Sequence, residues 1–208
     1  RSRPPSQGGS EQAMVTFTVA NALTVLRLVL TPFFVAAFIL SLQKTAFVLF
    51  CVAGFTDLID GSVARLLNQR SRGGAILDPL ADKLLMQSCF ALLAFEGLVP
   101  LWFFLLAFAR DATIVSGIIY LERKKADLPY SPILVSKIAT LVQLAVAILG
   151  LLLWWKPHLS PAGIPLQDLL VWSVFAASVF IIASGFQYVR IGFELLRRNA
   201  ARREHRLP

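Results

Sequence analysis

The chain has 208 residues, of which 57% are hydrophobic, and a formal net charge of +8. Soluble domains are roughly 45–50% apolar, so this composition and a mean hydropathy of +0.70 exclude an ordinary soluble domain and predict an integral membrane protein. The positive charge does not indicate nucleic-acid binding, because the basic residues gather in short segments between and after apolar runs, where anionic lipid headgroups attract them.

The ends of the chain differ in composition from its middle. Residues 1–13 are rich in Ser, Gly and Pro and are expected to be disordered or foreign to the natural protein, with Met14 as a candidate natural start. A single six-helix membrane domain is expected over residues 14–198, and a basic cytoplasmic tail over 199–208.

Six apolar runs follow the first segment, each near or above the ~20 residues that cross a bilayer. The predicted fold is therefore all-α and integral to the membrane, with six transmembrane helices. Pro79 and Pro100 stand near two of the predicted helix starts, where a missing N–H costs little. The helices are expected at residues 21–42, 44–67, 79–96, 98–121, 134–155 and 167–197.

Lys and Arg are distributed unevenly between the connections. The connections after the second and fourth runs and the C-terminal tail are basic, whereas the opposite connections carry only Lys44 and Lys156. Because positively charged loops stay in the cytoplasm, both termini and the stretch 57–82 are predicted to lie at the cytoplasmic face. The membrane would be a bacterial inner membrane, or the matrix-side equivalent in an organelle.

Four carboxylates lie within the stretch 57–82. Asp57 and Asp60 are three residues apart and Asp78 and Asp82 four residues apart, so each pair shares one face of a helix. Without a partner, such anions at the edge of hydrocarbon would repel one another and take up protons. A divalent cation between them removes this cost, so the pattern predicts a metal site. The alternative is that these residues cap helices or pair with neighbouring basic side chains.

Small and basic residues accompany the first pair of carboxylates. Gly61 and Ala64 continue the helix face of Asp57 and Asp60, and their lack of bulk would let a flat nucleobase or a diphosphate approach the backbone. Close helix packing is the alternative. Arg65 suits a diphosphate, because a planar guanidinium donates two parallel hydrogen bonds to phosphate oxygens; the alternative is snorkelling to the headgroups.

A second group of polar residues interrupts the other apolar runs. Arg27 and Arg110 lie too deep in their runs for easy snorkelling, and buried cations that converge from three helices suggest a pocket for an anionic group. The alternative for each is an internal ion pair, with Asp111 or with the Asp cluster. The group consists of Asn21, Thr24, Arg27, Arg110, Asp111, Ser136, Lys137, Thr140 and Gln143.

The carboxylate stretch also carries a recognisable family pattern. It reads Asp57-x2-Asp60-Gly61-x2-Ala64-Arg65-x8-Gly74-x3-Asp78-x3-Asp82. This pattern closely resembles the signature of the CDP-alcohol phosphatidyltransferases, and every fixed position of that signature is present. The resemblance extends over about residues 21–143. It implies transfer of a phosphatidyl group from CDP-diacylglycerol to an acceptor hydroxyl, with release of CMP.

The resemblance also implies roles for the motif residues. Mg²⁺ or Mn²⁺, with two ions expected, would be bound by Asp57, Asp60 and Asp78. Asp82 would approach the metals too, and as the last Asp it would act as general base on the acceptor hydroxyl. CDP would be bound by Gly61, Ala64, Arg65 and Gly74.

Family members with glycerol-based acceptors resemble the second polar group. The residues implied to hold the acceptor phosphate are Asn21, Thr24, Arg27, Arg110, Lys137 and Thr140. Glycerol-3-phosphate is the first expected acceptor, which would give phosphatidylglycerophosphate. Phosphatidylglycerol is the second, because the pairs Arg110-Asp111 and Ser136-Lys137 look closer to eukaryotic-type cardiolipin synthases, whereas typical phosphatidylglycerophosphate synthases have Arg-Glu and Gly-Lys there.

The expected partners are CDP-diacylglycerol, the acceptor, membrane lipids and, by resemblance only, a second copy in a homodimer. A membrane prenyltransferase also uses Asp-x-x-Asp pairs and Mg²⁺, but its two motifs are separated, whereas both pairs here fall within 57–82. A transporter with a buried carboxylate cluster is the alternative that is not an enzyme.

Overall fold

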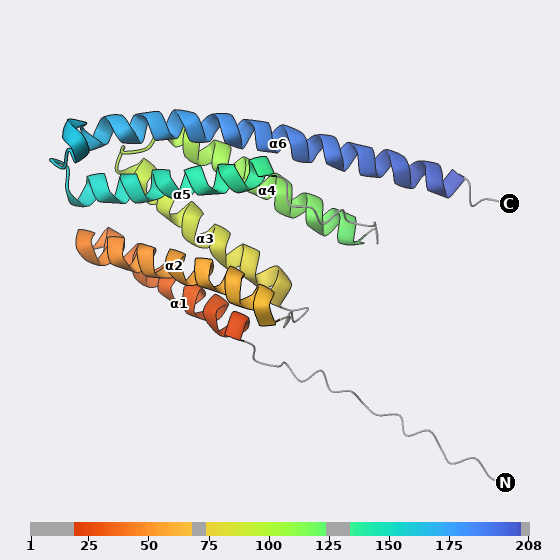
Figure 1. The fold of residues 1–208 in the computed structure, drawn as a ribbon, viewed down its shortest axis with the longest axis horizontal. Helices are drawn as coiled ribbons and strands as arrows, with labels where there is room; N and C mark the ends of the chain where they lie inside the picture. Colours follow the sequence, from red (N-terminus) through yellow and green to blue (C-terminus); the bar gives the residue numbers. More distant parts are fainter. Residues whose placement is uncertain (1–18, 68–73, 124–133, 205–208) are drawn as a thin grey trace, which may run out of the picture.

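The computed structural model describes the backbone of residues 19–67, 74–123 and 134–204, and side chains over 25–56, 83–117, 135–161 and 163–192. Within these ranges every regular element is a helix and none is a strand (Figure 1). The predicted all-α fold is therefore confirmed for the part of the chain that is described. The predicted N-terminal segment 1–13 lies outside it, as do residues 205–208 of the predicted tail 199–208, whose residues 199–204 are helical.

Six helices occur close to the predicted positions, with a short 3-10 turn between the last two. They are α1 (Val19–Ile39), α2 (Gln43–Leu67), α3 (Gly74–Phe95), α4 (Leu101–Arg123), α5 (Leu134–Trp155) and α6 (Leu166–Glu204), and the turn spans Pro161–Gly163.

Two helix boundaries differ from the prediction. α3 begins at Gly74 and not near Pro79, so Pro79 lies within the second turn and the helix forgoes the one hydrogen bond that its missing N–H would donate. α6 ends at Glu204 and not at residue 197. The predicted end followed the apolar run, whereas the Arg, Ala and Glu residues after it continue a helix readily.

The helices form two groups that pack against each other (Figure 1). α1 contacts α2 and α3, while α6 contacts α4 and α5; contacts of α3 with α4 and of α2 and α3 with α5 join the groups. Aromatic pairs also link the two groups. Phe38 of α1 stacks on Trp154 of α5 with ring centroids 4.0 Å apart, and Phe90 of α3 meets Phe103 of α4 edge to face at 5.3 Å.

The connections decide which helix ends lie together. The short connection 40–42 makes α1 and α2 antiparallel neighbours, and its Ser41 adopts a positive φ of 57°. Figure 1 shows the start of α1, the end of α2 and the start of α3 at one end of the molecule, where α4 also ends and α5 begins. The helix ends that carry the Asp motif are therefore gathered at this end, called the motif end below.

Two of the described helical segments are long and apolar enough to cross a membrane, Val135–Trp155 and Leu166–Gly192. Shorter apolar segments cover Val25–Ile39, Gln43–Thr56 and Lys83–Phe95. The six predicted helices are therefore present, and within the described residues two of them contain a segment that meets the length and hydropathy of a membrane span.

Candidate active site

The Asp motif lies on two helices that contact each other. Asp57 and Asp60 belong to the last turns of α2, and Asp78 and Asp82 to the first turns of α3. Each pair sits in one continuous helix, so the predicted sharing of a helix face holds for the backbone. The side chains of all four lie outside the described residues, and their assignment as metal ligands stays a prediction.

The predicted CDP-binding residues lie on the same two helices. Gly61, Ala64 and Arg65 follow the first Asp pair within α2, and Gly74 is the first residue of α3. Their side-chain surroundings, like those of Asn21 and Thr24 near the start of α1, are outside the described part of the chain. The binding roles of these residues therefore also remain predictions.

Arg110, near the middle of α4, is buried, with 5% of its surface exposed. Its Nη1 donates to Oδ1 of Asp111 at 2.8 Å, and its Nη2 donates to Oγ of Ser136 at 2.6 Å and to Oγ of Ser184 at 3.1 Å. A longer bond joins its Nε to Ser184 at 3.4 Å. Of the alternatives for Arg110, the ion pair with Asp111 is the one that the structure shows.

Asp111 is buried as well and connects α4 to α3. Its Oδ1 also accepts a hydrogen bond from Nζ of Lys83 at 2.9 Å, and its Oδ2 accepts one from Nε2 of Gln87 at 3.0 Å. Lys83 and Gln87 are four residues apart on α3, which places both on the face toward α4. Both oxygens of the carboxylate are therefore engaged.

These six residues, Lys83, Gln87, Arg110, Asp111, Ser136 and Ser184, form a polar network that joins α3, α4, α5 and α6. Among them two cations share one carboxylate, so the network carries one excess positive charge. Inside a weakly polar interior such a charge is costly unless an anion approaches it. The network therefore favours an anionic ligand nearby. Of its two cations, Arg110 is the more deeply buried, and each of its nitrogens already donates to a protein acceptor.

The remaining members of the second polar group take different positions. Arg27 of α1 is 2% exposed and its carbonyl accepts a hydrogen bond from the hydroxyl of Thr31 at 2.8 Å. On α5, Lys137 is exposed, while the half-buried Thr140 donates to the carbonyl of Ser136 at 3.1 Å. Thr140 thus contacts the Arg110 network through the backbone of Ser136. The roles of all three residues as acceptor ligands stay predictions.

Sequence reasoning missed two members of the network and underrated a third. Ser184 and Gln87 were not expected in the site, and Lys83 was considered only as one of the basic side chains that could pair with the Asp motif. Gln87 carried a usable signal, because an amide within the apolar run of α3 needs a partner. Ser184 carried none, since a serine in a membrane helix commonly bonds within its own helix.

Comparison with known protein families matches residues 17–183, most of the chain, to the description "CDP-alcohol phosphatidyltransferase". The chain belongs to the CDP-alcohol phosphatidyltransferase family. Membership confirms the family expected from the motif and speaks against the prenyltransferase and transporter alternatives.

Several curated relatives in the family are similar to this chain. A fission yeast (Schizosaccharomyces pombe) "Cardiolipin synthase (CMP-forming) / mitochondrial hydrolase fusion protein" is 41% identical over 54% of this chain and 19% of its own length. The human "Cardiolipin synthase (CMP-forming)" is 30% identical over 85% of this chain and 62% of its own. This chain thus spans less than two thirds of both cardiolipin synthases.

A bacterial relative matches over more of its length. The Escherichia coli K12 "CDP-diacylglycerol--glycerol-3-phosphate 3-phosphatidyltransferase" is 36% identical over 83% of this chain and 93% of its own length. Relatives in this family therefore carry two kinds of name, one for the synthesis of cardiolipin and one for transfer to glycerol-3-phosphate.

Proposed function

We propose that the chain transfers a phosphatidyl group from CDP-diacylglycerol to a hydroxyl of a glycerol-type acceptor that bears a phosphate, with release of CMP. One observation besides family membership carries the proposal: the buried network with its excess positive charge includes Lys83, the residue directly after Asp82 of the motif. An anion held by the network would therefore lie close to the proposed general base.

Within the network we assign the acceptor phosphate to Lys83. Its ammonium group has three N–H donors, of which Asp111 accepts one at 2.9 Å, and its side chain is 22% exposed. Every nitrogen of Arg110 already donates to a protein acceptor, with one N–H of Nη1 left over among the described contacts, so its main part would be to hold Asp111, which in turn aims the ammonium group. Further proposed contributors are Asn21, Thr24, Arg27, Lys137 and Thr140.

The donor set of the motif fits a hard divalent cation, because carboxylate oxygens are the ligands that Mg²⁺ and Mn²⁺ prefer and two adjoining helices carry four of them. Asp57, Asp60, Asp78 and Asp82 would hold Mg²⁺ or Mn²⁺, which when bound supplies neutralisation of the diphosphate charge.

The chain's own residues would carry the proton and the nucleotide. Arg65 would donate two parallel hydrogen bonds to the diphosphate, and the small Gly61 and Ala64 would let the nucleotide approach α2. Asp82 would accept the proton of the acceptor hydroxyl. The oxygen of that hydroxyl would form a bond to phosphorus while the bond from phosphorus to the CMP oxygen breaks.

Glycerol-3-phosphate is the first proposed acceptor. The supporting observation is that this chain matches 93% of the length of the E. coli relative whose name contains that acceptor. Phosphatidylglycerol is the second, supported by the two relatives named cardiolipin synthase and by the Arg110-Asp111 and Ser136-Lys137 pairs. Both acceptors present a phosphate and a glycerol hydroxyl, which is the chemistry that Lys83 and Asp82 would recognise.

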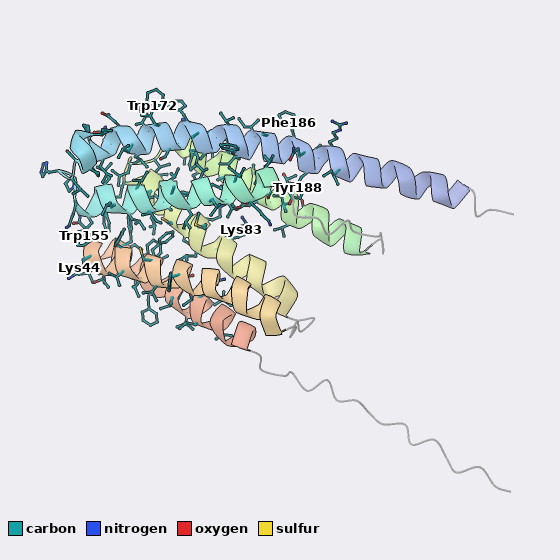
Figure 2. All side chains as sticks on the ribbon, in the orientation of Figure 1. Lys44, Lys83, Trp155, Trp172, Phe186 and Tyr188 are labelled. Carbon is teal, nitrogen blue, oxygen red and sulfur yellow. The ribbon has the colours of Figure 1, made fainter. Side chains whose placement is uncertain are left out.

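We further propose that all six helices lie in the membrane, with the motif end at the cytoplasmic face, and that the chain forms a homodimer. Exposed apolar side chains support the membrane assignment. Trp172 and Phe186, each 73% exposed, point away from the bundle on α6 (Figure 2). In water such side chains would be an aggregation hazard.

The test is CMP release from CDP-diacylglycerol by purified protein, with glycerol-3-phosphate and phosphatidylglycerol offered in parallel. Release is expected to require Mg²⁺ or Mn²⁺, to stop with EDTA and to return when the metal is added back. Asp82→Asn should abolish it, whereas Asp168→Asn, at the exposed start of α6, should not.

The outcomes separate the proposals. Release with only one alcohol assigns the acceptor. Release that survives EDTA, or that Asp82→Asn leaves intact, would refute the metal site or the general base. Folded protein that releases no CMP with any alcohol acceptor would refute the transferase itself.

A further inference from the structure

An apolar groove of about 450 Å³ runs along the outside of the bundle between α1 and α3. Several lining residues are exposed, among them Pro32, Ala36 and Leu84, so the groove opens toward the surroundings of the protein. Its lining consists of Leu28, Thr31, Pro32, Val35, Ala36, Ile39, Leu84 and Ser88.

The hollow arises from the size and bonding of these side chains. Ala36 of α1 and Ser88 of α3 are small and stand between the larger Leu28, Ile39 and Leu84. Thr31 adds little polarity, because its hydroxyl donates to a backbone carbonyl of its own helix at 2.8 Å. The groove is therefore suited to a flexible apolar chain and offers little to a polar ligand.

The groove begins beside the proposed active site and leads away from it. On α3, Leu84 is two residues beyond Asp82, and on α1 Leu28 directly follows Arg27. From Leu28 to Ile39 the α1 side extends roughly 16 Å at about 1.5 Å per residue, which is about half of the ~30 Å hydrocarbon core and so the depth of one leaflet.

We propose that this groove holds one acyl chain of the diacyl nucleotide donor during the reaction, an inference that rests on the proposed function. Its length equals one leaflet, its volume is of the order of a single long fatty acyl chain, and its start adjoins the residue proposed to take the acceptor proton. Because bulk lipid is as apolar as the groove, an acyl chain gains no hydrophobic transfer energy by entering it. The gain comes from van der Waals contacts with the lining and from a fixed orientation of the donor.

Filling the groove tests this assignment. Ala36→Phe places a ring in the groove from an exposed position, and Ala176→Phe makes the same exchange on the exposed outer face of α6 as a matched control. The Michaelis constant for long-chain CDP-diacylglycerol, measured as mole fraction in mixed micelles, should rise roughly five-fold for Ala36→Phe, the scale of several lost van der Waals contacts. It should not change for the control.

Two further readings make the test specific. With a dihexanoyl donor, whose chains are too short to occupy the groove, the two variants and the wild type should behave alike, which also shows that Ala36→Phe is folded. The Michaelis constant for the acceptor should be the same in all three.

If Ala36→Phe and Ala176→Phe had equal Michaelis constants for the long-chain donor, the inference would be overturned and the groove would be occupied by bulk lipid. An increase that persists with the short-chain donor would overturn it as well, because the effect would not act through the chain. If wild-type protein releases no CMP from either donor, the proposed function fails and not merely the groove.

Discussion

At the scale of single residues, Arg110 is the clearest case of a buried cation whose bonding limits what it can do. Asp111, Ser136 and Ser184 take its donors from three helices. A guanidinium bonded in this way is held more firmly than a lysine ammonium would be, because its rigid, planar N–H groups can bond several acceptors at once. Its influence on an acceptor would therefore pass through Asp111 to Lys83.

Ser184→Ala tests this positioning role. The change removes the acceptor of the Nε and Nη2 bonds at 3.4 and 3.1 Å, and losing a buried partner costs about 1 kcal/mol. We expect a lower melting temperature in detergent and a several-fold higher Michaelis constant for the acceptor, with that for CDP-diacylglycerol unchanged.

Ser178→Ala is the matched control for this variant. Ser178 is also buried on α6, but its hydroxyl donates to the carbonyl of Val174 in the same helix at 2.7 Å, so its loss should change neither constant. If the two variants behaved alike, Ser184 would have no positioning role.

Asp111→Asn tests the charge balance of the network. The change would leave Lys83 and Arg110 with no carboxylate at this position, and breaking a buried ion pair on one side costs about 3 kcal/mol or more. The melting temperature should fall clearly. Adding Lys83→Met should recover part of the loss, because one cation fewer is then left uncompensated; strictly additive losses would contradict the pairing.

At the scale of whole helices, the approach of α3 and α5 depends on Gly150. A Cβ placed on Gly150 would lie 2.7 Å from Cδ1 of Leu93, which is fully buried. Gly150 of α5 thus makes room for a leucine of α3, as small residues do where membrane helices pack closely. The contact helps to fix α3, which carries half of the Asp motif and two members of the network.

We expect Gly150→Ala to destabilise the protein by about 1–2 kcal/mol, because Leu93 must move within a packed core. Thermal unfolding in detergent measures this, and combining the change with Leu93→Val should recover part of the loss. Gly117→Ala is the control, since a Cβ there meets nothing within 4 Å and a helix gains up to about 1 kcal/mol from Gly to Ala. A Gly150→Ala protein as stable as the wild type would show that the helices separate easily.

At the scale of the whole molecule, the two ends of the bundle differ in their chemistry. The motif and the network lie toward one end, where Figure 2 labels Lys83, whereas Lys44 and Trp155 lie at the opposite end. There Nζ of Lys156 lies 4.7 Å from the ring centroid of Trp155. Tryptophan beside lysine is typical of a membrane interface, so the molecule has the polarity that a fixed orientation requires.

The proposed orientation predicts opposite accessibility of the two ends. A His158→Cys variant, with Cys51 and Cys89 replaced by Ala, carries a thiol in the exposed connection between α5 and α6. A membrane-impermeant maleimide should label it from the non-cytoplasmic side of intact cells and not from the outside of inverted vesicles. The reverse pattern would place the motif end away from the cytoplasm.

The sequence by itself determined the helices and the family motif. Long apolar runs can satisfy their backbone hydrogen bonds in lipid only as helices, and the spacing of Asp57, Asp60, Asp78 and Asp82 depends only on position along helices. Its errors were at helix ends such as Gly74, where the apolar pattern stops but helix formation does not.

Only the tertiary structure decided what the buried cations do. Arg110 and Asp111 are adjacent in sequence, and adjacent residues on a helix do not face each other, so the sequence could not choose between an anion pocket and an ion pair. The choice was made by the approach of α3, α5 and α6, which bring Lys83, Ser136 and Ser184 to the same two side chains. Contacts between helices far apart in sequence leave no periodic signal in any one of them, and for that physical reason the network required the fold.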